Sequence, residues 1–125
     1  MRINTIAFAG IPVTDIERAC DFHEGVLGLK VAEGMMDGKW IEYAVGDHTL
    51  GIANVGDQWR PSDHGTTAAL EVENFEPTIQ TLQNKGIRFA AEPFATRCCH
   101  MAVVQDPDGN KLIIRKLKPK KEEEV

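Results

Sequence analysis

The sequence predicts an α+β fold in which one supersecondary unit, strand–helix–strand–strand–strand, is used twice. Two matches within the chain predict it. Val13–Glu17 (VTDIE) matches Val72–Glu76 (VENFE) 59 residues later, and Gly28–Ala32 (GLKVA) matches Gly86–Ala90 (GIRFA) 58 residues later. A self-match at nearly constant offset, with apolar, polar and glycine positions in step, is typical of a repeated structural unit.

The length and composition of the chain restrict its class. It has 125 residues, 42% of them hydrophobic, and a net charge of −5, which suits one compact domain over residues 1–117 followed by a charged tail at 118–125. The negative charge argues against nucleic acid as a partner, and no apolar run approaches the roughly 20 residues that span a membrane. Three cysteines without an apolar leader predict a reduced, cytoplasmic protein.

The first half begins with a strand and a helix. Residues 4–12 start with an apolar run, as a strand covered on both faces would. Thr14 and Glu17 have the spacing of a capping box, and a stripe of apolar residues follows, which predicts a helix over residues 14–27 that ends at Gly28. Three further strands are then expected, at residues 30–36, 40–45 and 48–54.

The connections between these strands carry their own signals. Asp37-Gly38 predicts a two-residue hairpin turn between the second and third strands. Residues 55–65 are dense in Gly, Asp, Pro and Ser and predict a linker. The linker divides the chain into modules at about residues 3–54 and 66–117.

The second half has the same elements in the same order. A strand is expected over residues 66–73, and Asn74 is the expected N-cap of a helix over residues 77–85 that ends at Gly86. Asp106–Asn110 (DPDGN) predicts a tight turn. The remaining strands of this half are expected at residues 88–91, 98–105 and 111–117.

These motifs, in this order on this repeat, resemble the vicinal oxygen chelate superfamily, which groups glyoxalase I, bleomycin-resistance proteins and extradiol dioxygenases. The resemblance covers about residues 3–117. It implies two βαβββ modules that form curved mixed sheets around a cleft, and a homodimer. The pieces that carry it are Val13–Ala19 with Phe22, Val26–Leu29, Leu70–Val72 with Lys85–Ile87, and Asp106–Asn110.

The resemblance also implies where a metal would bind. Metal-dependent members hold a divalent ion with four side chains from the first and last strands of the two modules, and the matching positions here are Phe8, Gly51, Thr67 and Ile113. Three of these have no donor atom, and threonine is a poor neutral ligand. The sequence therefore predicts no metal and no cofactor at this site, and it argues against lactoylglutathione lyase activity.

A ligand pocket is expected in place of the metal. Strand alternation puts Glu71 on the face of Thr67, and Arg115 on the face of Ile113. A mostly apolar concavity with a few polar groups suits a small organic molecule, and Arg115 would favour an anionic one. The predicted ligand-binding residues are Phe8, Thr67, Glu71, Ile113 and Arg115, with Trp40, Tyr43 and Trp59 as stacking candidates for which ordinary packing is the alternative.

An enzyme of the same superfamily is the alternative function. A metal-free enzyme would use His100, Glu71 or Arg115, and His100, on a strand expected to border the cleft, would serve as acid or base. The catalytic residues are left open, with His100 and Glu71 as candidates. Adjacent Cys98 and Cys99 are expected to point to opposite faces of a strand and to pack rather than chelate. A metal-dependent form would use unconventional ligands: His48, His64 and His100.

Overall fold

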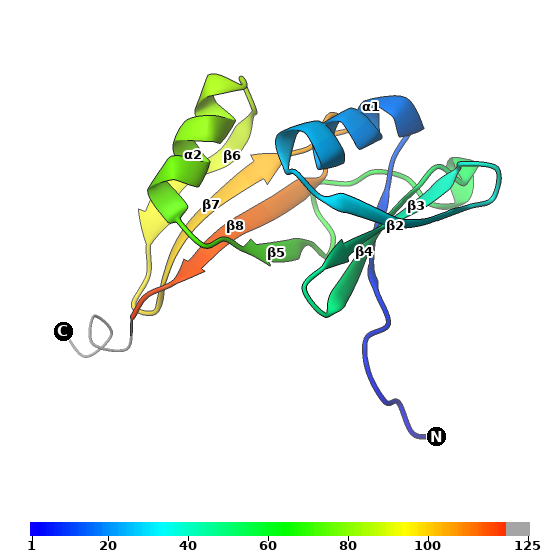
Figure 1. Ribbon diagram of the computed structural model, residues 1–125, viewed down its shortest axis with the longest axis horizontal. Helices are drawn as coiled ribbons and strands as arrows, with labels where there is room; N and C mark the ends of the chain where they lie inside the picture. The colour runs from blue at the N-terminus through cyan, green and yellow to red at the C-terminus, as the bar shows by residue number, and fades with distance from the viewer. Residues whose placement is uncertain (120–125) are drawn as a thin grey trace. The chain divides into compact units, whose positions relative to one another are not determined.

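The computed structural model describes residues 1–119 and divides the chain into two units, residues 1–61 and the chain from Ser62 onward. Each unit has a four-stranded mixed sheet with a helical segment on it (Figure 1). This confirms the α+β fold and its repeated βαβββ unit. The first unit contains β1 (Ala9–Pro12), α1 (Ile16–Cys20), the π-helix η1 (Asp21–Val26), β2 (Lys30–Met35), β3 (Trp40–Val45), β4 (His48–Ala53) and the short 3-10 helix η2 (Gly56–Gln58).

The second unit repeats the strand order of the first. The first sheet runs β1-β4-β3-β2 and the second β5-β8-β7-β6, and in each the first strand pairs in parallel with the last. The identical order is the structural counterpart of the internal sequence match. The second unit contains β5 (Ala68–Glu71), α2 (Phe75–Asn84), β6 (Phe89–Ala95), β7 (Cys99–Gln105) and β8 (Lys111–Leu117).

The first helix differs from its prediction at its N-terminus and in its winding after Cys20. Its N-cap is Asp15 rather than Thr14: the Asp15 carboxylate accepts a hydrogen bond from the backbone N–H of Arg18 at 3.1 Å. Thr14 instead accepts from the Arg18 guanidinium at 3.1 Å. Aspartate and threonine are both favoured N-caps, so the capping-box pattern alone did not separate them. After Cys20 the helix continues as the wider π-helix η1.

The π-helix buries two neighbouring side chains. Phe22 is 4% exposed and His23 is fully buried. The His23 ring stacks on that of Tyr43, with centroids 5.6 Å apart, and the Tyr43 hydroxyl donates to the Glu24 carboxylate at 2.9 Å. Burial raises the pKa of Tyr43, so the phenol stays neutral and remains a donor. These contacts join the helical segment to the sheet.

The turns show which backbone conformations local sequence signals predict and which they do not. The positive φ values of Gly28 and Gly86, both 71°, confirm the predicted helix stops. The Asp37-Gly38 hairpin was predicted as a two-residue turn, but Met35 pairs with Trp40 and the connection has four residues. Met36 and Asp37 both have φ of 55°, a conformation that the dipeptide signal does not predict for Met36.

The second unit also departs from prediction in its helix and edge strand. The helix α2 begins at Phe75, directly after the predicted cap Asn74, whose side chain makes no capping hydrogen bond. The edge strand β6 is longer than predicted and includes Pro93. Its pairing with β7 shifts register between Ala91 and Phe94, and proline is tolerated at such irregular positions of edge strands.

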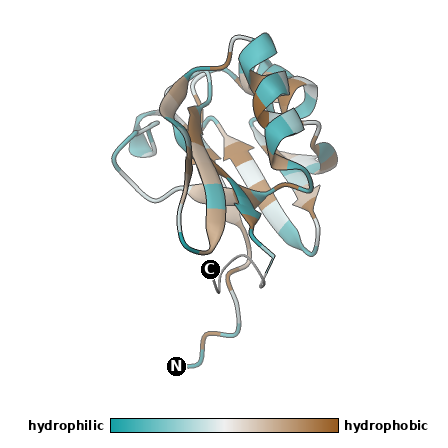
Figure 2. Cartoon of the chain, turned by 90° about the vertical axis from the view of Figure 1, so that its left-hand side faces the viewer, coloured by the Kyte–Doolittle hydropathy of each residue, from teal (hydrophilic) through white to brown (hydrophobic). Residues whose placement is uncertain are grey.

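Hydropathy follows the pleat of the strands. Figure 2 shows hydrophobic and hydrophilic bands that alternate along several strands. Alternate residues of β8, Leu112 and Ile114, are buried beside Ala102 and Val104 of β7. Each sheet therefore has one face packed into its own core. None of the helices within residues 1–119 has the length and apolar character needed to cross a membrane.

The predicted turn at Asp106–Asn110 is confirmed and is organised by a buried carboxylate. Asp106 is 5% exposed and accepts hydrogen bonds from the backbone N–H groups of Asp108 (2.9 Å) and Asn110 (2.8 Å) and from the Asn110 amide (2.9 Å). Burial nevertheless raises the pKa of Asp106. The desolvation cost of the charge therefore exceeds the stabilisation from these donors.

We expect this carboxyl to make stability depend on pH. Because its pKa is higher in the folded than in the unfolded chain, where it is about 3.9, its stabilising contribution is present below that value and is lost as pH rises through the folded pKa. Wild type should gain stability relative to Asp106→Asn as pH falls from 7 toward 4, by about 1.4 kcal/mol per unit of pKa difference. Urea unfolding at several pH values measures this. A constant difference, or one of opposite sign, would contradict it.

Candidate functional site

Three aromatic side chains of the first unit gather on one face of its sheet, and we call Phe8, Trp40 and Trp59 the aromatic cluster. The Phe8 and Trp40 rings meet edge to face with centroids 5.5 Å apart, and the Trp40 and Trp59 rings stack at 6.1 Å. Phe8 is 41% exposed, and both indoles are half-buried. The cluster thus presents accessible aromatic surface.

Glycines form the floor beneath these rings. Gly10 of β1 pairs directly with Gly51 of β4. A Cβ atom built on Gly10 would lie 2.7 Å from Cη2 of Trp59, and one on Gly51 would lie 3.6 Å from Nε1 of Trp40 and 3.8 Å from Phe8. The absence of side chains at the two positions therefore lets the rings approach the backbone.

The polar groups beside the cluster include two carboxylates. Trp40 Nε1–H donates to the Glu42 carboxylate at 3.0 Å. Glu42 pairs across strands with Gly51 on one side and with Glu33 on the other, so both carboxylates share the face of the cluster. Like charges in directly opposed positions repel. A ligand with hydrogen-bond donors or positive charge would relieve that repulsion, and cations also bind favourably to indole faces.

Trp59 also borders a hollow of about 480 Å³. The hollow is lined by residues 13–14 and by parts of the segment 54–61, which includes η2. Volumes of this size are typical of small-molecule sites. Trp59 therefore connects an open aromatic surface with a concavity in the same unit.

Tyr43 does not belong to this site, which corrects its prediction as a stacking candidate. It pairs with Leu50, whereas Trp40 pairs with Ala53, and residues three apart on a strand point to opposite faces. Tyr43 is fully buried and contacts His23 and Glu24 on the helix side. It is a core residue.

The predicted ligand-binding residues of the second unit form a separate group. Arg115 Nη1 pairs with the Glu71 carboxylate at 2.9 Å, and the other Glu71 oxygen accepts from the backbone N–H of Leu117 at 2.8 Å. Ile113 shares their face of the sheet. The Thr67 hydroxyl donates to the backbone carbonyl of Lys111. The expected preference for an anionic ligand depended on the positive charge of Arg115. The Glu71 carboxylate offsets that charge.

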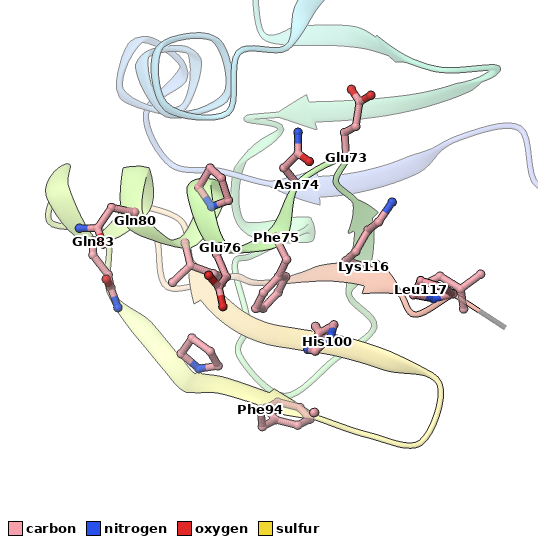
Figure 3. A pocket seen from close by; sticks show the side chains of 15 residues that line it. Glu73, Asn74, Phe75, Glu76, Gln80, Gln83, Phe94, His100, Lys116 and Leu117 are labelled. Carbon is pink, nitrogen blue, oxygen red and sulfur yellow. The ribbon is translucent and has the colours of Figure 1, made fainter. Parts of the chain in front are cut away.

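His100 lies on the other side of this sheet from Glu71 and Arg115, so the structure does not bring these three candidates together. It pairs with Lys116, whereas Met101 pairs with Arg115. Its ring lies 5.7 Å from that of Phe75 in α2. Figure 3 shows it lining a hollow of about 820 Å³ whose lining also includes Phe75, Lys116 and Phe94. His100 therefore borders a different hollow from the face that carries Glu71 and Arg115.

The side chains present do not fit the metal site of metal-dependent relatives. Phe8 packs on Trp40, the Thr67 hydroxyl is used by a backbone carbonyl, and Gly51 and Ile113 offer no donor. His48 is exposed at the start of β4, and His64 contacts Asp63 at 3.0 Å. Within residues 1–119 no group of three or more His, Cys, Asp or Glu side chains is placed to hold a metal ion. We derive no metal-dependent step.

Glu42 and Glu33 are site residues that the sequence reasoning missed. Glu42 follows Trp40 by two positions in a strand whose bounds were predicted correctly, so strand alternation already placed both on one face. Glu33 lies two residues before Met35, the partner of Trp40, so alternation from the hairpin end of β2 also places it on this face. Counting from Lys30 at the other end fails, because the register shifts between Val31 and Glu33.

Comparison with solved structures shows the same fold over nearly the whole chain. TnmS3, an antibiotic binding protein from Streptomyces sp. CB03234, is 23% identical, with a TM-score of 0.78 over 94% of this chain and 99% of TnmS3. UcmS2 is 25% identical, with a TM-score of 0.74 over 92% and 98%. A glyoxalase/dioxygenase from Nostoc punctiforme is 17% identical, with a TM-score of 0.75 over 94% and 100%. No curated protein matches significantly.

A family model shows which family the chain belongs to, whereas these structural similarities show its fold. It matches residues 2–114, which include both repeated units and the turn at Asp106–Asn110. The match agrees with the resemblance that the sequence motifs carry. The chain belongs to the Glyoxalase/Bleomycin resistance protein/Dioxygenase superfamily.

Proposed function

We propose that this protein binds a small, planar aromatic molecule, neutral or positively charged, by stacking it on the aromatic cluster without a metal ion. The observation that carries the proposal is the accessible arrangement of Phe8, Trp40 and Trp59 above Gly10 and Gly51. Accessible aromatic rings offer flat apolar surfaces on which a planar molecule can stack.

The charge preference rests on the groups that border the cluster. Glu42 and Glu33 share its face, and Glu42 already accepts one hydrogen bond from Trp40. A cationic or donor-bearing ring would gain a carboxylate partner there, whereas an anionic ring would meet two negative charges. TnmS3, which has the same fold, is an antibiotic binding protein, and this supports a binding role for the present chain.

Titration with three probes tests the proposal. Proflavine is planar and cationic, anthraquinone-2-sulfonate is planar and anionic, and adamantylamine is cationic but not planar. The chain has two tryptophans and both belong to the cluster, so quenching or shifting of their fluorescence reports on this site. We expect saturable binding in the order proflavine, then anthraquinone-2-sulfonate, then adamantylamine. Calorimetry provides a readout free of optical overlap. Equal or absent binding of all three would overturn the proposal.

Adding one methyl group to the floor is expected to weaken binding of the planar probe. In Gly10→Ala the new Cβ would stand 2.7 Å from the Trp59 ring, so the indole must leave the position in which it stacks on Trp40. We expect affinity for proflavine to fall about three- to tenfold, which corresponds to about 0.7–1.4 kcal/mol. Gly65→Ala is the matched control, because a Cβ there meets no atom within 4 Å. Equal affinities of the two variants would contradict the prediction.

We further propose that the protein is a homodimer. The edge strands β2 and β6 carry exposed apolar side chains, including Val31 at 50% and Phe94 at 42% exposure. Exposed edges of this kind favour pairing with another chain unless they are protected. Light scattering at micromolar concentration should give about twice the 13.8 kDa mass of one chain. A mass near that of one chain would contradict dimerisation.

A further inference from the structure

The sulfur atoms of Cys98 and Cys99 lie 3.0 Å apart, although the two side chains were predicted to point in opposite directions. That prediction failed because β7 begins at Cys99, so Cys98 belongs to the preceding turn and does not follow strand alternation. Hydrogen bonds fix the turn: Thr96 donates its backbone N–H to the Cys99 carbonyl at 2.8 Å, and the backbone N–H of Lys118 donates to the Cys98 carbonyl at 2.8 Å. These bonds hold the backbone that carries both thiols.

The two thiols have different surroundings. Cys98 is exposed, whereas Cys99 is 3% exposed. Arg115 Nε–H donates to the Cys99 sulfur at 3.2 Å, and this hydrogen bond raises the pKa of Arg115, so the guanidinium stays charged. It can stabilise negative charge that develops on the sulfur during reaction. One thiol is thus accessible to a reagent, and the other lies behind it next to a cation.

We propose that Cys98 and Cys99 form a redox-active dithiol that hydroperoxides oxidise to a disulfide between the two neighbouring residues. The sulfur of Cys98 attacks the peroxide, the O–O bond breaks, and the distal oxygen leaves as water with the thiol proton, which gives a sulfenic acid on Cys98. The Cys99 sulfur then attacks that of Cys98, the S–S bond forms, and the S–O bond breaks to release a second water. Two thiols and one hydrogen peroxide yield one disulfide and two waters.

The product should be easy to reduce. The Cα atoms of adjacent residues are about 3.8 Å apart across a trans peptide, shorter than the roughly 4.4–6.8 Å that unstrained disulfides span. Strained disulfides have more oxidising potentials and are the labile ones. Oxidation at this pair should therefore be readily reversed by a dithiol.

Cys20 provides an internal reference. It lies in the first unit, and burial raises its pKa, so it remains a thiol at neutral pH and reacts slowly. The chain has three cysteines, so Cys20→Ser leaves only the proposed pair. The dithiol shares no residue with the aromatic cluster, and its test is independent of ligand binding.

Mass spectrometry of the full chain tests the proposal. The Cys20→Ser protein is treated with hydrogen peroxide, quenched with catalase and alkylated with iodoacetamide. We expect the intact mass to fall by two hydrogen atoms, neither thiol to be alkylated, and dithiothreitol to restore both. With Cys99→Ser in addition, the reaction should stop at a Cys98 sulfenic acid that dimedone traps.

Three results would overturn it. The first is that both thiols remain open to alkylation after a treatment that oxidises free cysteine. The second is an oxidised product that joins two chains on a non-reducing gel. The third is a Cys98 that proceeds to sulfinic acid while Cys99 stays reduced. The main measurement uses the unaltered pair, so it does not depend on how the Cys99→Ser variant folds.

Discussion

Replacing Trp59 with alanine is expected to weaken proflavine binding about tenfold or more while changing the free energy of unfolding much less. Stacking of a planar ring on an aromatic side chain contributes about 1–3 kcal/mol, and 1.4 kcal/mol corresponds to tenfold in affinity. Trp59 lies after η2, outside the sheet, and is half-buried. Its removal therefore takes away ligand surface without opening the core.

The same substitution at Trp40 should have an effect at least as large, because its ring contacts both other members of the cluster. Trp40→Phe is the matched control: it keeps a ring but removes the Nε1–H that donates to Glu42. We expect most of the affinity to survive in this variant. Isothermal titration measures affinity, and urea unfolding measures stability. Unchanged affinity in both alanine variants would place the ligand site elsewhere.

Replacing Tyr43 should give the opposite pattern. Tyr43→Ala is expected to lower the free energy of unfolding by about 3–5 kcal/mol, as for other buried aromatic residues, because it removes a fully buried ring stacked on His23. Tyr43→Phe keeps the ring and loses the hydrogen bonds of the hydroxyl to Glu24 and Cys20, at a cost of about 1 kcal/mol. Proflavine affinity of Tyr43→Phe should equal that of wild type.

The Tyr43→Phe variant keeps this prediction testable even where Tyr43→Ala leaves too little folded protein, since small domains have only about 5–15 kcal/mol of stability. Urea unfolding of both variants, with binding measured on the folded one, separates the two faces of the sheet. A Tyr43→Phe variant that folds normally but loses proflavine affinity would show that Tyr43 contributes to the site after all.

The sequence predicted those parts of the fold that depend on local signals. The internal match between the halves predicted the repeated unit. The helix stops at Gly28 and Gly86 and the turn at Asp106–Asn110 each require one backbone conformation, and each was found. The π-helix η1 was not foreseen, because an apolar stripe does not specify how tightly the turns wind. The four-residue hairpin was missed because its length depends on the pairing of Met35 with Trp40.

The candidate site was predictable in part. Phe8, Trp40 and Trp59 were all expected to contact a ligand, but nothing local to Trp59 indicates that its ring reaches Gly10. The strand that contains Tyr43 was predicted with its correct bounds, so alternation along it was enough to place Tyr43 on the face opposite to Trp40. Cys98 was misassigned for a different reason. The direction of its side chain depends on where β7 begins, and strand boundaries are weakly specified by sequence.

The most direct test of the proposed site is nuclear magnetic resonance of the two indole N–H groups. The chain has two tryptophans, so a ¹⁵N-labelled sample gives two such signals, which Trp40→Phe and Trp59→Phe assign. On titration with proflavine we predict that both signals shift and saturate together, with the same dissociation constant that calorimetry gives. Saturable binding by calorimetry that leaves both indole signals unmoved would contradict the aromatic cluster as the ligand site.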